Sequence, residues 1–331
     1  MLQFALFEMD EARRLLGEGH LPAQRVALLL LDNAAEVLLD RWIESDLVFD
    51  GVEQRLQETA RSWGVPADHP GFAELLSKRF RTQQEKRKLS RYFDEKLDYV
   101  TAVKPMLSKD IASTLSHLHR YRNQAYHSGR VRRQTLRTSA IILLELCCQL
   151  AFTLRPRMAG VSSKEDYSWL ESRFGVRPGA LWDDDGLSRV LDDLRKGLPV
   201  TDESLGRTLS ENLLSRIQDV YASLDFIVGS TYAADRTAAL SFAHEHVLEE
   251  VKLDPPYGRV PARLGEPVST TQLEELSQSS QGIVQAHDGV AAFAAFAGPD
   301  MDLERIEFVV ESLSRAVDEM VQDAIDVALG K

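Results

Sequence analysis

Residues 120–127 read Arg-Tyr-Arg-Asn-Gln-Ala-Tyr-His, and the stretch around them has the pattern of a helix with a charge on its apolar side. Its apolar residues recur at spacings of four, three and seven, which is one helical face. Arg122 occupies the remaining position of that face. Because a lone buried charge is costly, its guanidinium must find a partner or line a cleft. The apolar members of this face are Ile111, Leu115, Leu118 and Ala125.

Two further polar residues belong to the same segment. Asn123 and His127 stand four residues apart, so their side chains can meet on one helix face. Ser128-Gly129 then provides a helix stop, and Ser108 a plausible N-cap at the other end. An arginine, an amide and an imidazole are therefore expected to converge near a helix end.

The six residues Arg122-Asn123-Gln124-Ala125-Tyr126-His127 resemble the signature of the HEPN superfamily. That signature is Arg, a polar residue that is often Asn, three variable residues and His. The flanks on both sides, residues 118–121 and Ser128-Gly129, are also similar to those of the family. The resemblance covers roughly residues 1–158 and implies a helical bundle, whereas the remainder resembles no family that we recognise.

The resemblance implies an endoribonuclease that works without a metal or a cofactor and uses the RNA 2′-hydroxyl as nucleophile. His127 would act as general base or acid, because the ordinary pKa of histidine is near neutrality. Arg122 would hold the scissile phosphate, and Asn123 would orient His127 or bind the phosphate. In this family two motifs face each other across a homodimer. The resemblance also suggests a bacterial toxin or an antiviral defence effector, with tRNA or mRNA as target.

Two other classes of function stay open. HEPN-like domains also occur as non-catalytic modules that bind RNA or nucleotides, and an all-helical chain can be an assembly adaptor. A metal-free ribonuclease assay separates the enzyme from both alternatives, and RNA binding without cleavage separates the two alternatives from each other.

Charge is unevenly distributed along the chain. Residues 1–160 hold 24 Lys and Arg against 20 Asp and Glu, a charge of +4, and the remainder carries −16, against −12 for the whole. Residues 111–144 contain no acid. A basic field around the motif fits a polyanion such as RNA, although a solvated face is the alternative. The expected RNA-binding residues are Arg120, Arg130, Arg132 and Arg133.

The other elements expected in the first half are also helices, with no strand-like alternation. They cover residues 2–16, 21–45, 50–63, 72–103 with a break or bend near Ser90, and 131–154. The second of them carries acids within an apolar run, and these are candidate partners of Arg122, with exposure to solvent as the alternative. The candidate residues around the catalytic set are Asp32, Asn33, Glu36 and Tyr126. His117 and His119 lie off the apolar face and are expected at the surface, with contact to RNA as a further role there.

The sequence predicts an all-α protein of two domains, residues 1–158 and 163–331, separated by the polar stretch 155–163. In the acidic second domain, the last helix has a heptad pattern over residues 303–329, which predicts a helix–helix contact within the chain or with a protein partner. His244-Glu245-His246 lacks metal-ligand spacing, and no metal site is expected.

Location and redox state can also be predicted. The N-terminal residues lack the basic start and cleavage site of a signal peptide, and no apolar run is long enough for a membrane span. A cytoplasmic protein is therefore expected. Cys147 and Cys148 are adjacent within an apolar run, so they are expected to be buried free thiols.

Overall fold

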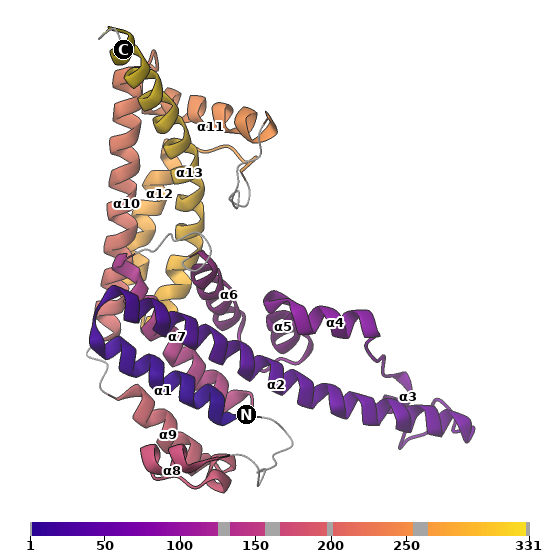
Figure 1. Ribbon diagram of the computed structural model, residues 1–331. Helices are drawn as coiled ribbons and strands as arrows, with labels where there is room; N and C mark the ends of the chain where they lie inside the picture. The colour runs from indigo at the N-terminus through magenta and orange to yellow at the C-terminus, as the bar shows by residue number, and fades with distance from the viewer. Residues whose placement is uncertain (1, 125–132, 156–165, 197–200, 254–263, 329–331) are drawn as a thin grey trace. The chain divides into compact units, whose positions relative to one another are not determined.

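The computed structural model describes residues 2–124, 133–155, 166–196, 201–253 and 264–328 (Figure 1). Within these ranges the chain forms helices and turns and no β-strand. The predicted all-α class is confirmed. The only described stretch long and apolar enough to cross a membrane is Gln134–Thr153. Of its 18-residue apolar segment, 78% is buried inside the protein.

The chain divides into two compact units. The first comprises Met1–His127 with Ser139–Pro199, and the second comprises Ser128–Thr138 with Val200–Lys331. This division differs from the predicted domains 1–158 and 163–331. The reason is that helices α8 (Ser168–Phe174) and α9 (Asp184–Arg195) pack with the N-terminal helix.

Polar contacts attach these two helices to the first unit. Arg173 of α8 forms an ion pair with Asp10, at 2.9 Å. Arg13 donates a hydrogen bond of 2.7 Å to the carbonyl of Lys196, just beyond α9. These partners lie more than 160 residues apart in sequence, so no local pattern could have placed them together.

The first unit begins with a helical hairpin. Helix α1 (Leu2–Glu18) packs along the first half of α2 (Leu21–Ser62). The turn between them uses Gly19 at φ +76°, a left-handed conformation that favours glycine. His20 then caps α2 by accepting a hydrogen bond from the backbone N–H of Ala23, with Pro22 in the first turn.

Helix α7 (Arg133–Thr153) completes this core from Ser139 onward. Most of its apolar side chains are buried, with Phe152 exposed, and the Sγ of Cys147 lies 3.3 Å from the carbonyl oxygen of Leu31 in α2. Both cysteines are buried free thiols, as predicted.

The second half of α2 carries the segment that leads to the motif. This segment contains α3 (Ala73–Ser77), α4 (Gln83–Arg91), α5 (Phe93–Asp98), a π-helical turn (Tyr99–Val103) and α6 (Lys109–Asn123). The single helix predicted over 72–103 is therefore wrong, although one of its breaks, at Tyr92, falls near the predicted bend.

Polar side chains hold this segment to α2. The Gln57 amide donates to the carbonyls of Leu75 and Lys78, at 2.7 and 2.9 Å. The Tyr99 hydroxyl donates to the buried Asp46, at 2.6 Å. Because these contacts satisfy polar groups along one continuous face, α2 runs unbroken where two helices, 21–45 and 50–63, were predicted.

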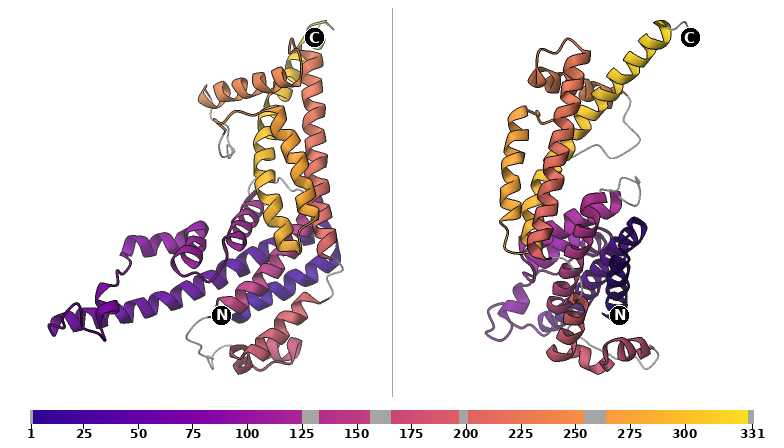
Figure 2. Two further views of the ribbon diagram at one scale, coloured as in Figure 1. Left: turned by 180° about the vertical axis from the view of Figure 1, so that it is seen from behind. Right: turned by 90° about the vertical axis from the view of Figure 1, so that its left-hand side faces the viewer.

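The second unit contains α10 (Asp202–Ser230), α11 (Arg236–Leu253), α12 (Thr270–Val284) and α13 (Gly289–Ala328). Helices α10, α12 and α13 lie alongside one another (Figure 2). A Cβ on Gly206 would meet the carbonyl oxygen of Ile283 at 2.8 Å, so glycine permits the close approach of α10 and α12. Arg216 of α10 binds Asp300 and Glu307 of α13.

The first half of the heptad pattern in α13 packs inside the second unit. Leu303, Ile306, Val310, Leu313 and Val317 are buried. Beyond them, Met320 and Val327 are 63% and 77% exposed. Of the described heptad positions, a partner that binds through 303–329 would therefore find only those after Val317 accessible.

Candidate functional site

The motif helix α6 begins where the sequence predicts. The Ser108 side chain accepts a hydrogen bond from the backbone N–H of Ile111, at 3.3 Å, and caps the helix. Leu115 and Leu118 are buried, so the apolar face is directed into the protein. The helix ends at Asn123, which presents Arg122 and Asn123 on its last turn.

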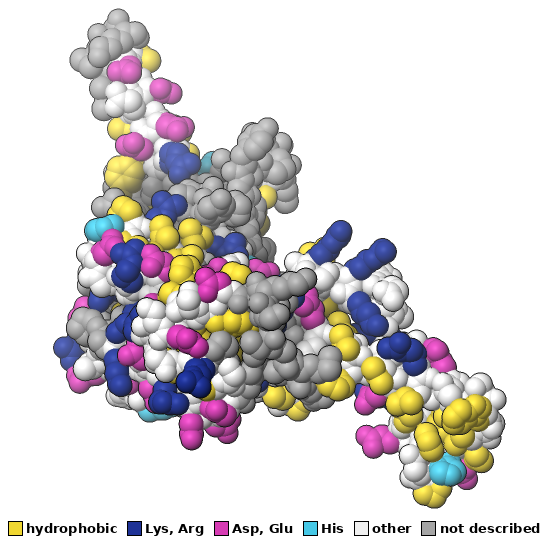
Figure 3. All heavy atoms as spheres, turned by 60° about the horizontal axis from the view of Figure 1, so that its bottom comes forward, with side chains coloured by type: hydrophobic (Ala, Val, Ile, Leu, Met, Phe, Trp, Pro, Cys, Tyr) yellow, Lys and Arg dark blue, Asp and Glu magenta, His cyan; other side chains and the backbone are white. Residues whose placement is uncertain are grey.

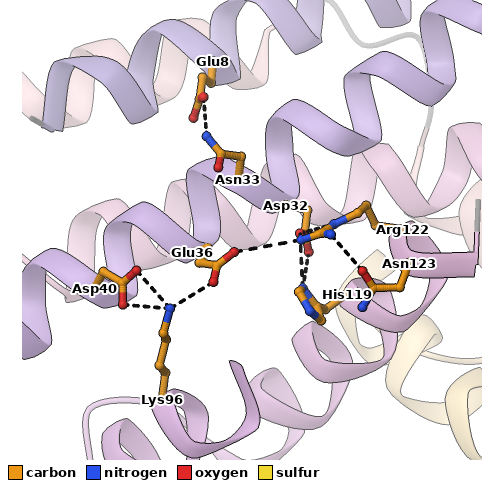
Figure 4. A network of polar contacts seen from close by, with 9 residues as sticks. All are labelled: Glu8, Asp32, Asn33, Glu36, Asp40, Lys96, His119, Arg122 and Asn123. Atoms are coloured by element: carbon orange, nitrogen blue, oxygen red, sulfur yellow. Dashed lines mark hydrogen bonds and ion pairs between the residues drawn. The ribbon is translucent and has the colours of Figure 1, made fainter. Parts of the chain in front are cut away.

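A buried carboxylate on α2 receives the charge of Arg122. Asp32 is 1% exposed, and its Oδ2 lies 2.6 Å from Nε and 2.5 Å from Nη2 of Arg122 (Figure 4). Two N–H groups on one carboxylate form a charge-assisted, strongly directional contact. Each charge offsets the cost of burying the other. Asp32 is therefore the partner that a charged residue on the apolar face of α6 requires.

The remaining nitrogen of the guanidinium is also engaged. Its Nη1 donates to Oδ1 of Asn123, at 2.8 Å, while Glu36 lies further away, 3.9 Å from Nη2. The Arg122 side chain is held in one orientation by Asp32 on one side and Asn123 on the other. Arg122 and Asn123, predicted as catalytic, are thus in contact.

The sequence interpretation missed the role of His119. Its Nδ1 lies 2.9 Å from Oδ1 of Asp32, and its ring is stacked on Phe93 of α5 with centroids 4.2 Å apart and planes at 7°. The expected surface position is wrong for both histidines: His117 is buried, and His119 is only partly exposed because α2 and α5 cover it. The signal was available: positions 119 and 122 are three apart and share a helix face.

Glu36 connects this cluster to a second buried charge. Lys96 of α5 is 1% exposed and binds Glu36 at 3.0 Å and Asp40 at 2.8 Å. Burial acts to lower the pKa of Lys96, but its hydrogen bonds to Asp40 and Glu36 outweigh this effect and leave the pKa raised. For Asp40 burial outweighs the lysine, and the pKa of its carboxyl is raised. Two cations and three carboxylates thus join α2 to α5 and α6.

Other predicted site residues lie apart from the cluster or outside the described residues. Asn33 points away from Arg122 and donates to Glu8 of α1, at 2.5 Å (Figure 4), because successive residues of α2 face different sides. Arg120 contacts His117, at 3.3 Å, within α6. The backbone of Arg133 begins α7, and its side chain is outside the described atoms. Tyr126, His127, Arg130 and Arg132 also lie outside the described residues.

Comparisons with protein-family models, curated proteins and solved structures find no match. Among the described residues, no group of three or more His, Cys, Asp and Glu side chains is placed to hold a metal ion. The cluster combines a fixed guanidinium, an amide and an imidazole with the carboxylate of Asp32, which orients the guanidinium and the imidazole.

Proposed function

We propose that the chain is a metal-independent endoribonuclease of the HEPN type. The observation that carries the proposal is the orientation of Arg122 by Asp32 and Asn123 on the last described turn of α6. A catalytic guanidinium has to be preorganised toward the charge that develops in the transition state. The motif continues to His127 along the sequence, four residues after Asn123.

The proposed reaction needs no nucleophile from the protein. The RNA 2′-oxygen attacks the adjacent phosphorus and loses its proton to a base, and the bond from phosphorus to the 5′-oxygen breaks. An acid protonates the departing 5′-oxygen, which yields a 2′,3′-cyclic phosphate and a 5′-hydroxyl. His127 supplies one of these proton transfers, and Arg122 stabilises the negative charge on the phosphoryl oxygens.

The second proton transfer requires another group. In a homodimer, the motif of a second copy would supply it, and a two-fold axis would place both motifs in one composite cleft. Within one chain, His119 is the alternative. Asp32 holds its Nδ1, and no described residue hydrogen-bonds its Nε2, an arrangement that orients an imidazole for proton transfer.

One observation favours a second candidate function, a non-catalytic RNA- or nucleotide-binding module. Asp32 and Asn123 engage three nitrogens of Arg122, and the Asp32 carboxylate already balances the charge of the guanidinium before any phosphate binds. In this reading the ion pair fastens α6 to α2 and serves stability alone. Binding of RNA without cleavage would identify this alternative.

The deciding experiment is cleavage of mixed cellular RNA in the presence of EDTA by the wild-type protein and His127→Ala. Loss of a positioned acid–base group is expected to lower the rate by about 10²–10⁴-fold. His287→Ala, which removes an exposed histidine of the second unit, is the matched control and should retain full activity. RNA lacking the 2′-hydroxyl should resist cleavage. Equal rates for wild type and His127→Ala, or activity only with added metal, would contradict the proposal.

By analogy with the family, we place this activity in a bacterial toxin or antiviral defence effector that acts on cytoplasmic tRNA or mRNA. Induced expression in a bacterium should then arrest growth, and His127→Ala should relieve the arrest. Sequencing the 5′-hydroxyl ends that appear after induction would identify the RNA target.

A further inference from the structure

The exposed side of α4 carries a compact group of cations, which we call the basic face: Arg87, Lys88 and Arg91. Positions 87 and 91 are four apart and positions 88 and 91 three apart, so the three side chains share one helical face. Leu89, on the opposite side, is buried and anchors the helix. Figure 3 shows Lys and Arg side chains gathered along this part of the first unit.

The basic face is not used for pairing inside the protein. Among the described residues, none accepts a hydrogen bond or forms an ion pair with Arg87, Lys88 or Arg91 through their charged groups. Their neighbours behave differently. Lys78 binds Asp50, and Arg79 binds Glu85. Three unpaired cations on one helix of a chain with net charge −12 indicate a surface that attracts a polyanion.

The end of α4 links the basic face to the candidate site. Tyr92, which ends the helix, is 56% exposed and offers its ring to solvent. The next residue is Phe93, whose buried ring is stacked on His119, and His119 binds the same carboxylate as Arg122. Cations followed by an exposed aromatic ring match the demands of a single-stranded nucleic acid, whose phosphates pair with cations and whose bases stack on rings.

We propose that the basic face of α4 and Tyr92 bind the backbone and one base of single-stranded RNA and direct the strand toward the cluster of Asp32, His119 and Arg122. The inference rests on the proposed ribonuclease function and names the surface that its substrate uses. An anionic membrane is the less suitable partner. A helix that lies in a membrane surface needs large apolar residues on its exposed side, and Leu89 of α4 is buried.

The test compares two triple variants of the full-length protein. The first, Arg87→Gln/Lys88→Gln/Arg91→Gln, removes the basic face. The control, Lys109→Gln/Arg177→Gln/Arg315→Gln, removes the same charge from exposed positions elsewhere. Binding of a fluorescent single-stranded RNA is followed by anisotropy over a range of salt concentrations. Loss of three phosphate contacts should make the negative slope of log K against log salt less steep by about 2, and the control should keep the wild-type slope.

Tyr92→Ala adds a readout that charge alone would not change. Loss of a stacked base should weaken RNA binding on the order of tenfold with an unchanged salt slope. In cleavage assays, the triple variant at the basic face should raise KM and leave kcat near the wild-type value. It should fold normally, because its three substituted side chains are exposed.

Three results would overturn the inference. The triple variant at the basic face could bind RNA with the affinity and salt slope of the wild type, or the control could lose as much RNA affinity as that variant. The third result is a wild-type protein that binds anionic phospholipid vesicles and does not bind RNA. A separate result would overturn only the proposed catalysis. In that case the triple variant loses RNA affinity and the control does not, while the wild-type protein cleaves no RNA.

Discussion

At the scale of single residues, Asp32 determines how the motif is held. It binds His119 and Arg122 of α6, and His119 in turn is stacked on Phe93 of α5. Three helices therefore depend on one buried carboxylate. This explains how a sequence with a charge on an apolar helix face can fold.

Replacing Asp32 by Asn should destabilise the first unit by roughly 3 kcal/mol, because removal of one partner leaves the charge of Arg122 partly buried and uncompensated. Urea unfolding at neutral pH measures the change. Asp68→Asn, at an exposed position, is the matched control and should stay within about 0.5 kcal/mol of the wild type. A similar small effect for Asp32→Asn would show that the ion pair contributes little.

The two cysteines should be unreactive in the folded protein. Burial raises the pKa of Cys148 to about 12 and raises that of Cys147 as well, so neither forms a thiolate at pH 8. A colorimetric thiol reagent should therefore detect two thiols after unfolding and almost none before it. Rapid reaction of the native protein would contradict the packing of α7 against α2.

At the scale of elements, the continuous helix α2 depends on acids that would be costly without partners. Asp46 and Asp50 are buried along its second half, where Tyr99, Lys104 and Lys78 reach them. The sequence pattern predicted two helices with a break between residues 45 and 50, and Asp46 and Asp50 lie at that position. In the folded protein these acids are the points at which the following segment attaches.

Tyr99→Phe should destabilise the first unit by about 1–3 kcal/mol, since it removes the hydrogen bond to the carboxylate of Asp46. Tyr92→Phe, at an exposed ring, is the control and should change little. Thermal and urea unfolding of the two variants measure the difference. Equal stabilities would mean that the hydroxyl contributes nothing.

The same contact predicts a dependence of stability on alkaline pH. Burial and the hydrogen bond to Asp46 raise the pKa of Tyr99 above its ordinary value of 10.0. A raised pKa contributes stability that is complete below the unfolded value and is lost as pH rises through the folded value. The free energy of unfolding should therefore decline above about pH 10. Lys96, whose pKa is also raised, acts in the same direction. Tyr99→Phe should decline less steeply, and a parallel decline would contradict this assignment.

At the scale of the whole molecule, the heptad residues of α13 pack against other helices of the acidic second unit. Because the heptad residues from Leu303 to Val317 are buried in this unit, deletion from residue 300 onward should abolish its cooperative unfolding transition. A chain that ends at Asp318 keeps every buried heptad residue and should retain that transition. Calorimetry distinguishes the two truncations. Loss of the transition in the shorter deletion would show that the exposed end of α13 also stabilises the unit.

Several features of this protein follow from the sequence by itself. Helical periodicity identified the all-α class, the start of α6 at Ser108, the buried cysteines and the apolar face on which Arg122 lies. These features depend on spacings of a few residues, and local backbone geometry relates such spacings directly to a helix face.

Only the tertiary structure decided how distant residues meet. It selected Asp32 as the partner of Arg122, directed Asn33 toward Glu8 and placed His119 between Asp32 and Phe93. It also joined α8 and α9 to the first unit through Arg13 and Arg173. The partners in these contacts lie between 25 and 183 residues apart. Such pairs form only because packing of whole helices brings them together, and the pattern of any one helix does not contain that information.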